Sequence, residues 1–212
     1  TSLEGWDGVF FEKTASGTSF SFSCESRGLA VRLNADCDEK SNSVAWTVEL
    51  VNTSPEYAVV WLEYPRFCYK TDENACLFHP HGSGALLRGW PGTEAKHRDQ
   101  YPASAACMQF MALTDEACGE SVYYGVHDPG ASFKVFSYEK EKDSPVLRLY
   151  ARYFCENSGS PGNSQRLPGE LVIRAYRGDW YDAAMIYSEF VEKYATWLPR
   201  LENGARKDTP DW

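Results

Sequence analysis

Polar and apolar residues alternate with a period of two through most of the region from Thr18 to Tyr176, and this alternation restricts the fold more than any other feature of the chain. Such a period is typical of strands that bury one face against a core. Strands are predicted for the ranges 18–24, 29–33, 44–50, 57–64, 107–113, 121–127, 132–138, 146–154 and 171–176. Because turn residues such as Asp128-Pro129-Gly130 separate the runs, we predict a mostly β chain with an antiparallel β-sandwich or supersandwich over residues 1–177.

Two segments depart from simple alternation. Both faces of the run from Tyr57 to Tyr64 are apolar, so we expect this strand to lie between two layers. Between Pro65 and Pro102 the pattern weakens and is punctuated by Gly and Pro, which predicts a long loop region. Long loops in compact domains commonly carry function, so any ligand site is expected here.

The period changes at Gly178-Asp179. From Trp180 onward, apolar residues recur every three or four positions, as they do in an amphipathic helix. Asp179 is expected to cap its N-terminus, and Pro199 to end it. We therefore predict one C-terminal helix over residues 178–199 that packs on the sandwich, followed by a polar linker over residues 200–212 that leads to a further domain.

The net charge restricts the partners that the chain can bind, and the cysteines indicate the compartment in which it is found. The formal net charge of -9 has no opposing run of Lys or Arg, which argues against nucleic acid or an anionic membrane as a partner, and no apolar stretch approaches a spanning length. Seven cysteines without CxxC spacing predict mostly buried free thiols in a reducing compartment, which favours a cytoplasmic over a secreted location. A disulfide between Cys68 and Cys76 is the alternative that would indicate secretion.

The histidines are the first candidates for chemistry. His79-Pro80-His81 places two imidazoles two residues apart, but no third ligand follows at metal-binding spacing, so we expect neither a metal nor a cofactor. His127-Asp128 ends a predicted strand, where the carboxylate could orient the imidazole for acid–base work. The alternative, which we favour, is that Asp128 opens a turn and His127 is a strand-end residue.

Trp90 and Arg88 are the second candidates. In the predicted loop region, the Trp90 indole could stack on a sugar ring while Arg88 binds hydroxyl groups, and packing of Trp90 into the core is an equal alternative. Carboxylates are plentiful but form no pattern, and the charged stretch 139–143 reads as a solvated turn. No catalytic residue is therefore nominated.

Several segments together resemble the β-sandwich domain that precedes the catalytic barrel in a group of bacterial glycoside-hydrolase-like proteins. They are Val48–Ser54, Tyr64–Phe67, Tyr101-Pro102, Met108–Leu113, Tyr123–Pro129 and Tyr176–Tyr187. The resemblance implies a supersandwich like that of galactose mutarotase, joined to a (β/α)8 barrel that holds the catalytic carboxylates. It also implies that this chain lacks the first strands of a complete sandwich and ends about where the barrel begins, so no catalytic residue is carried over.

The expected function is that of a non-catalytic accessory domain of a glycoside hydrolase. Trp180, Tyr187 and Trp197 are expected to contact its own C-terminal catalytic barrel, and the region 65–102 to lend a loop to the sugar site. A carbohydrate would be bound through the parent enzyme, with the following candidate residues: Arg88, Trp90, His79, His81, His127 and Asp128. The alternatives are a carbohydrate-binding module and a stand-alone aldose epimerase that uses a histidine and a carboxylate.

Overall fold

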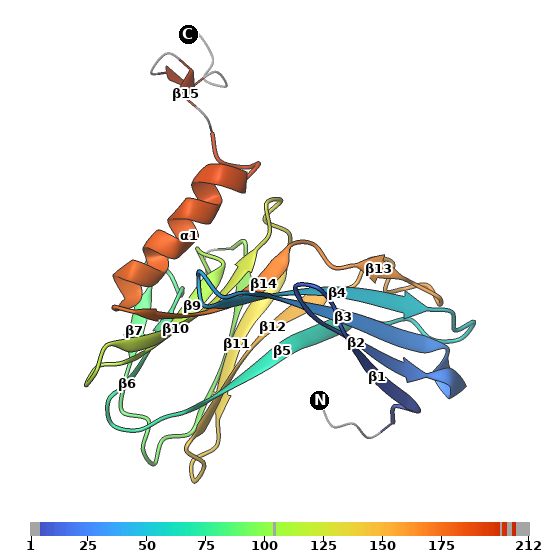
Figure 1. Ribbon diagram of the computed structural model, residues 1–212, viewed down its shortest axis with the longest axis horizontal. Helices are drawn as coiled ribbons and strands as arrows, with labels where there is room; N and C mark the ends of the chain where they lie inside the picture. Colours follow the sequence, from blue (N-terminus) through green and yellow to red (C-terminus); the bar gives the residue numbers. More distant parts are fainter. Residues whose placement is uncertain (1–4, 104, 200, 203–204, 207–212) are drawn as a thin grey trace.

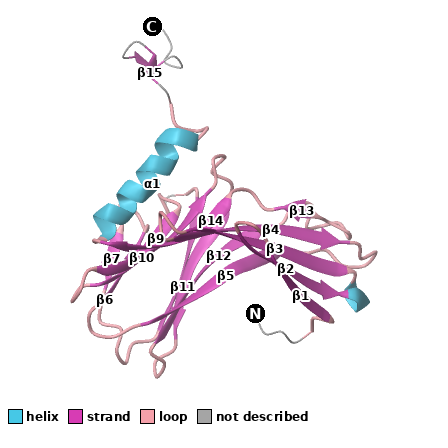
Figure 2. Cartoon of the chain, in the orientation of Figure 1, coloured by secondary structure: helices cyan, strands magenta, loops and turns pink. Residues whose placement is uncertain are grey.

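The computed structural model describes residues 5–103, 105–199, 201–202 and 205–206. Within these residues, two antiparallel sheets face each other and one α-helix lies outside them (Figures 1 and 2). The predicted mostly β sandwich with a C-terminal helix is confirmed. No described helix is long and apolar enough to cross a membrane.

The larger sheet contains ten of the described strands. In spatial order its path is β1 (Gly8–Lys13), β2 (Gly17–Cys24), β3 (Leu29–Asp38), β4 (Ser43–Asn52), β14 (Glu170–Arg177), β10 (Glu120–His127), β9 (Phe110–Asp115), β6 (Ala75–His79) and β7 (Ala85–Leu87). The short β13 (Gln165–Arg166) pairs with β4. A 3-10 turn, η1 (Glu25–Arg27), joins β2 to β3. Strand β1 has no counterpart among the predicted strands.

The smaller sheet has the order β5 (Trp61–Lys70), β12 (Val146–Phe154), β11 (Lys134–Lys140) and β8 (Ala95–Tyr101). Its inner face packs on the larger sheet through buried side chains that include Phe136, Leu147 and Leu149. A second apolar cluster lies on the outer face of the larger sheet, where Phe110 and Tyr123 contact helix α1 (Trp180–Tyr194). Strands β9 and β10 are therefore buried on both faces.

The prediction that the run 57–64 lies between two layers is wrong. Strand β5 begins only at Trp61, continues through Pro65 to Lys70, and forms an edge of the smaller sheet. An edge position tolerates proline, which cannot donate to a ladder. The apolar residue Trp61 is 46% exposed there.

The predicted long loop between residues 65 and 102 is also wrong, because this region holds the end of β5 and all of β6, β7 and β8. Strand β6 is buried at every residue and so shows no alternation. Strand β8 does alternate, but the residues it turns inward include His97 and Asp99, which a hydrophobic pattern cannot reveal. Likewise Lys140, expected in a solvated turn, is a buried strand residue.

The prediction for the start of the helix is confirmed. Asp179 accepts a hydrogen bond from the backbone N–H of Tyr181, and the backbone N–H of Asp179 donates to Asp182, which completes a capping box. Gly178 precedes this cap at φ +138°, where a Cβ would collide with the Asp182 carboxylate. The helix ends at Tyr194, earlier than expected, because Ala195 is extended and Thr196 bonds to the backbone of Pro129.

The expected linker contains a short hairpin, β15 (Leu201–Glu202) with β16 (Ala205–Arg206). Residues 200, 203–204 and 207–212 of that linker lie outside the described residues. All seven cysteines are free, including Cys68 and Cys76. Only three of them, Cys24, Cys76 and Cys155, are buried, so the expectation that most are buried is wrong.

Candidate functional site

The carboxylate of Asp99 is hydrogen-bonded to three imidazoles at the edge of the sandwich, where β6 and β8 face each other. His79 ends β6, His81 lies two residues later, and His97 precedes Asp99 on the same face of β8. Asp99 Oδ2 lies 2.7 Å from His79 Nε2 and 2.9 Å from His81 Nδ1. Asp99 Oδ1 lies 3.0 Å from His97 Nε2. Because a carboxylate only accepts, each imidazole donates an N–H to it.

The Asp99 cluster, defined as His79, His81, His97 and Asp99, runs from the interior to the surface. The side chains of His79 and Asp99 are 1% and 5% exposed, whereas those of His97 and His81 are 38% and 57% exposed. The ring of Tyr138 packs edge-on against His79 and is stacked on His97. The two inner groups are thus fixed, and the two outer ones reach solvent.

Burial and hydrogen bonding set the charges of the inner pair. Burial lowers the pKa of His79 to about 4, although Asp99 opposes this shift, so the imidazole is neutral near pH 7. Burial alone would raise the pKa of Asp99, but hydrogen bonds from His81 and His79 outweigh it and hold the pKa below its usual value. The pair therefore consists of an ionised carboxylate and a neutral imidazole. The opposite nitrogen of His79, Nδ1, is buried and has no hydrogen-bond partner in the part of the chain that the structure describes.

Neutral imidazole and carboxylate are ligands for divalent transition metals. One ligand atom each from His79, His97 and Asp99 lie within 4.8 Å of one another. The sequence has no third ligand at metal-binding spacing next to His79-Pro80-His81, and the expectation that no metal binds stays a prediction. The missing ligands come from β8, a strand of the other sheet, and not from the nearby sequence.

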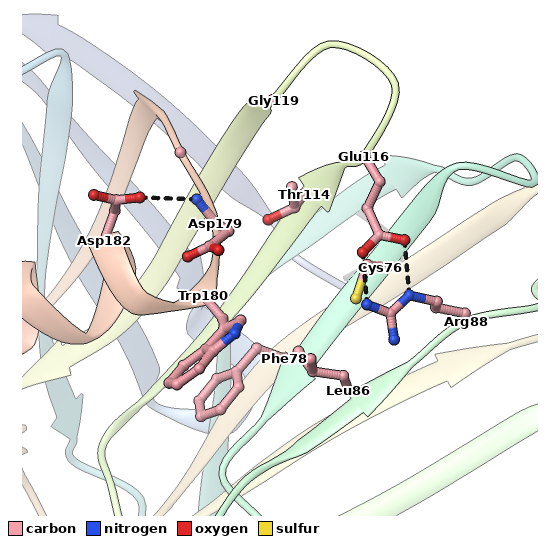
Figure 3. A pocket seen from close by; sticks show the side chains of 11 residues that line it. Cys76, Phe78, Leu86, Arg88, Thr114, Glu116, Gly119, Asp179, Trp180 and Asp182 are labelled. Carbon is pink, nitrogen blue, oxygen red and sulfur yellow. Dashed lines mark hydrogen bonds and ion pairs between the residues drawn. The ribbon is translucent and has the colours of Figure 1, made fainter.

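Arg88 lies elsewhere, in a pocket of about 430 Å³ between β6, β7, β9 and the start of α1 (Figure 3). Its guanidinium makes two hydrogen bonds, of 2.6 and 2.7 Å, to the carboxylate of Glu116. This contact with Arg88 holds the pKa of Glu116 below its usual value. Across the pocket, Trp180 is stacked on Phe78 with ring centroids 5.9 Å apart.

Trp90 does not form a platform for a sugar. It is 3% exposed and packs edge-on against Tyr138 in the core, as its packing alternative expected. Trp90 lies in the connection between β7 and β8, and its side chain packs into the core although its backbone is in a loop. Trp90 therefore offers no free ring face beside Arg88.

His127 and Asp128 do not form an acid–base pair. The His127 ring is stacked on Phe190 of α1 at 4.4 Å, and its Nε2 lies 3.0 Å from the hydroxyl of Tyr123. The Asp128 carboxylate accepts from Ser132 and from the ammonium group of Lys134, 2.9 Å away. The favoured alternative, a strand-end histidine followed by a turn aspartate, describes this geometry.

No family model matches the sequence. Over 212 residues, the chain is 27% identical to a Monosiga brevicollis protein named "Putative glycoside hydrolase 22789", with 94% of this chain and 17% of that protein covered. It is 25% identical over 156 residues to "Putative glycoside hydrolase" from Bacteroides thetaiotaomicron, covering 73% of this chain and 22% of that protein. The chain thus spans about a fifth of the length of these curated relatives.

Two solved structures resemble the fold. The α-N-acetylgalactosaminidase NagBb from Bifidobacterium bifidum, in complex with GalNAc, matches with a TM-score of 0.69 at 15% identity, covering 91% of this chain and 32% of that one. The GH36 α-galactosidase AgaB from Geobacillus stearothermophilus matches with a TM-score of 0.59 at 14% identity, covering 92% and 30%. The chain therefore shares the sandwich fold found in these two enzymes. The resemblance to a sandwich domain of glycoside-hydrolase-like proteins is confirmed.

In this sandwich fold, the three residues expected at a domain interface have different positions. Tyr187 is 7% exposed and packs on Phe110 of the sandwich itself, so it is not free to contact another domain. Trp180 and Trp197 are 40% and 43% exposed. Sequence reasoning placed all three on one apolar helix face, whereas the helix ends before Trp197.

His97 and Asp99 are the residues of the Asp99 cluster that sequence reasoning missed. They stand two apart in Lys96-His97-Arg98-Asp99, so a strand would place both on one face, and this was the available signal. Because both residues are polar, the alternation of apolar residues that indicates a strand is missing from this segment.

Proposed function

We propose that the chain is a non-catalytic accessory domain of a glycoside hydrolase and that it packs against the catalytic part of that protein through helix α1. Support comes from the sandwich fold shared with the two glycosidases and from the small share of the relatives' length that the chain spans. Both comparisons fit a unit that accompanies a larger catalytic part.

The observation that carries the packing is the set of exposed apolar side chains on α1 and on the segment after it. Tyr181 and Met185, one helical turn apart, are 59% and 47% exposed, and Tyr194 and Trp197 are 53% and 43% exposed. Exposed apolar groups gathered on one element mark interaction surfaces. Figure 1 shows that α1 lies outside both sheets and that β15 lies beyond the helix.

The non-catalytic part of the proposal has a direct assay. We expect the isolated chain to leave aryl α-galactosides and aryl N-acetyl-α-galactosaminides intact. Hydrolysis that follows saturation kinetics and survives repurification would disprove it.

The packing is tested by mixing the chain with the catalytic part of its full-length protein. The double variant Tyr181→Ser/Met185→Ser is expected to weaken the complex at least about tenfold, because interface energy concentrates in a few large side chains. The matched control is Phe10→Ser/Phe11→Ser on β1, at the other end of the sheet, where both side chains are more exposed than Tyr181 and Met185. Equal affinities for the two double variants would contradict the proposal.

A carbohydrate-binding module is the second candidate, and the pocket in Figure 3 favours it. The exposed Trp180 ring beside the Arg88–Glu116 pair supplies an aromatic surface and charged hydrogen-bonding groups in one concavity. Calorimetric titration with galactose and N-acetylgalactosamine tests it. Binding that is lost in Trp180→Ala supports the module, and the absence of heat with both sugars counts against it.

A further inference from the structure

We propose that His79, His97 and Asp99 form a binding site for a divalent transition-metal ion of the zinc class, with His81 as a fourth ligand on the solvent side. The proposal is independent of the accessory function. It rests on the convergence of three imidazoles and one carboxylate from two segments of the chain, residues 79–81 and 97–99.

The first argument is geometric. A tetrahedral zinc ion with bonds of about 2.0–2.2 Å sets its ligand atoms about 3.3–3.5 Å apart. The ligand atoms of His79, His97 and Asp99 already lie within 4.8 Å of one another. His79 Nε2 and Asp99 Oδ2, which are 2.7 Å apart without a metal, would have to separate by about 0.6–0.8 Å to reach this spacing. Because the His97 and His81 side chains are partly exposed, rotation of these two rings brings their nitrogen atoms to the ion.

The second argument concerns the orientation of His79. Its ring is buried, packs edge-on against His97 and Tyr138, and directs Nε2 at Asp99. Since Nδ1 has no hydrogen-bond partner among the described residues, the contact with Asp99 keeps the proton on Nε2. A cation bound at Nε2 would displace this proton to Nδ1, so that the imidazole stays neutral and Nε2 becomes a ligand.

The ligand types define the metal. Two or three imidazoles with one carboxylate suit Zn²⁺ and its transition-metal neighbours, whereas Ca²⁺ and Mg²⁺ prefer oxygen ligands. Two neutral imidazoles and one carboxylate leave a bound divalent ion with a net charge of +1. His81 Nδ1, 2.9 Å from the Asp99 carboxylate, is placed to supply the fourth ligand.

Bound metal would join the two sheets at this edge. His79 belongs to the larger sheet, and His97 and Asp99 belong to β8 at the edge of the smaller one. A ligand that binds only the folded chain stabilises it by mass action. At a Zn²⁺ concentration one hundred times Kd, we expect Tm to rise by about 5–10 °C.

The test uses the 212-residue chain after dialysis against a chelator. Cys107 needs a control, because its Sγ contacts the Pro80 carbonyl between His79 and His81. Titration with ZnCl₂ is therefore made with the exposed thiols alkylated and again with Cys107→Ser. We expect one equivalent of Zn²⁺ to bind in both preparations. Failure to bind in either preparation overturns the proposal.

The variants His97→Gln and Asp99→Asn are expected to weaken binding at least about tenfold, since even outer-shell partners of a metal contribute this much. The matched control is His127→Gln, the histidine that packs on Phe190 away from the cluster. Unchanged affinity in both cluster variants, or an equal loss in the control, contradicts the site.

A measurement on the unmodified chain covers the case in which a variant fails to fold. In NMR spectra, Zn²⁺ is expected to shift the imidazole resonances of His79, His97 and His81 and to leave those of His127 in place. Shifts confined to His127, or none at all, overturn the proposal.

Discussion

The hydroxyl of Tyr124, on β10, accepts a hydrogen bond of 3.0 Å from the backbone N–H of Ala151, on β12 of the opposite sheet. The same hydroxyl donates to the backbone carbonyl of Pro65 on β5, also at 3.0 Å. The β5–β12 ladder changes register at this point, between Leu149 and Ala151. A side chain from one sheet thus satisfies backbone groups that a bulge in the other sheet leaves unpaired.

Replacing Tyr124 by Phe is therefore expected to lower the free energy of unfolding by about 1–3 kcal/mol, because buried backbone groups lose their partner. Urea denaturation monitored by tryptophan fluorescence measures the change. The matched control is Tyr153→Phe, since the buried Tyr153 hydroxyl makes no hydrogen bond to a described residue. Similar decreases in the free energy of unfolding in the two variants would show that the hydrogen bonds of the Tyr124 hydroxyl do not stabilise the fold.

The sequence predicts the strands that bury one apolar face and the start of the helix. It misplaces a strand wherever polar side chains point into the core or apolar side chains point to solvent. Strand β8 turns His97 and Asp99 inward, so its alternation reads as polar, and β6 is buried on both sides, so it does not alternate. Strand β5 carries apolar residues on both faces yet lies at an edge, where Trp61 and Phe154 pack on each other.

The candidate site could be predicted only in part for the same reason. His79 and His81 are visible as a pair, but their partner Asp99 is brought to them by the meeting of two sheets. His79 on β6 and Asp99 on β8 are too far apart in the sequence to show the short spacing of a metal-binding motif. The converse holds at His127-Asp128, where neighbours in sequence contact different partners, Tyr123 and Lys134, as the favoured interpretation of this pair expects.

The cap of α1 gives a second prediction. Asp179→Ala removes the acceptor for the backbone N–H of Tyr181 and is expected to cost about 1 kcal/mol, with faster hydrogen exchange in the first turn. Thermal unfolding and hydrogen exchange measure the two effects. Glu189→Ala, at an exposed position of the same helix, serves as the control and is expected to change stability by less than about 0.5 kcal/mol. Equal losses would argue against a cap.

The third prediction concerns pH. Burial lowers the pKa of His127 to about 4 from the usual 6.5. Between these values the unfolded chain binds a proton that the folded chain does not, so this histidine makes stability fall as the pH decreases from 6.5 to 4. From pH 6.5 to pH 5 its share is about 1–2 kcal/mol.

His127→Gln removes that share, so its stability should depend less on pH over this range than the stability of the wild type. Urea denaturation at several pH values, with a chelator present, measures the slopes. NMR titration of the wild type gives an independent reading, in which His127 stays neutral above pH 5. Protonation of His127 near pH 6.5 would contradict the prediction.

The fourth prediction concerns the buried pair of Lys134 and Asp128, whose side chains are 0% and 3% exposed. Burial lowers the pKa of Lys134, although Asp128 opposes the shift. Burial would raise the pKa of Asp128, but hydrogen bonds from Ser132 and the charge of Lys134 keep it below its usual value. The 2.9 Å contact between Lys134 Nζ and Asp128 Oδ2 is therefore what compensates each of the two groups for its burial.

Lys134→Met leaves the Asp128 carboxylate buried without its cation, and Gln109 loses the ammonium group that bonds to its Oε1. Removing one partner of a buried ion pair costs about 3–5 kcal/mol. The double variant Lys134→Met/Asp128→Asn is expected to be more stable than Lys134→Met alone, because the uncompensated charge is gone. The exposed Lys142→Met is the control for loss of a positive charge. Urea denaturation of the wild type and of these three variants measures the differences. A double variant that is less stable than Lys134→Met would contradict the prediction, because it would mean that Asp128 acts mainly through the turn hydrogen bonds that it accepts from Gly130 and Ser132.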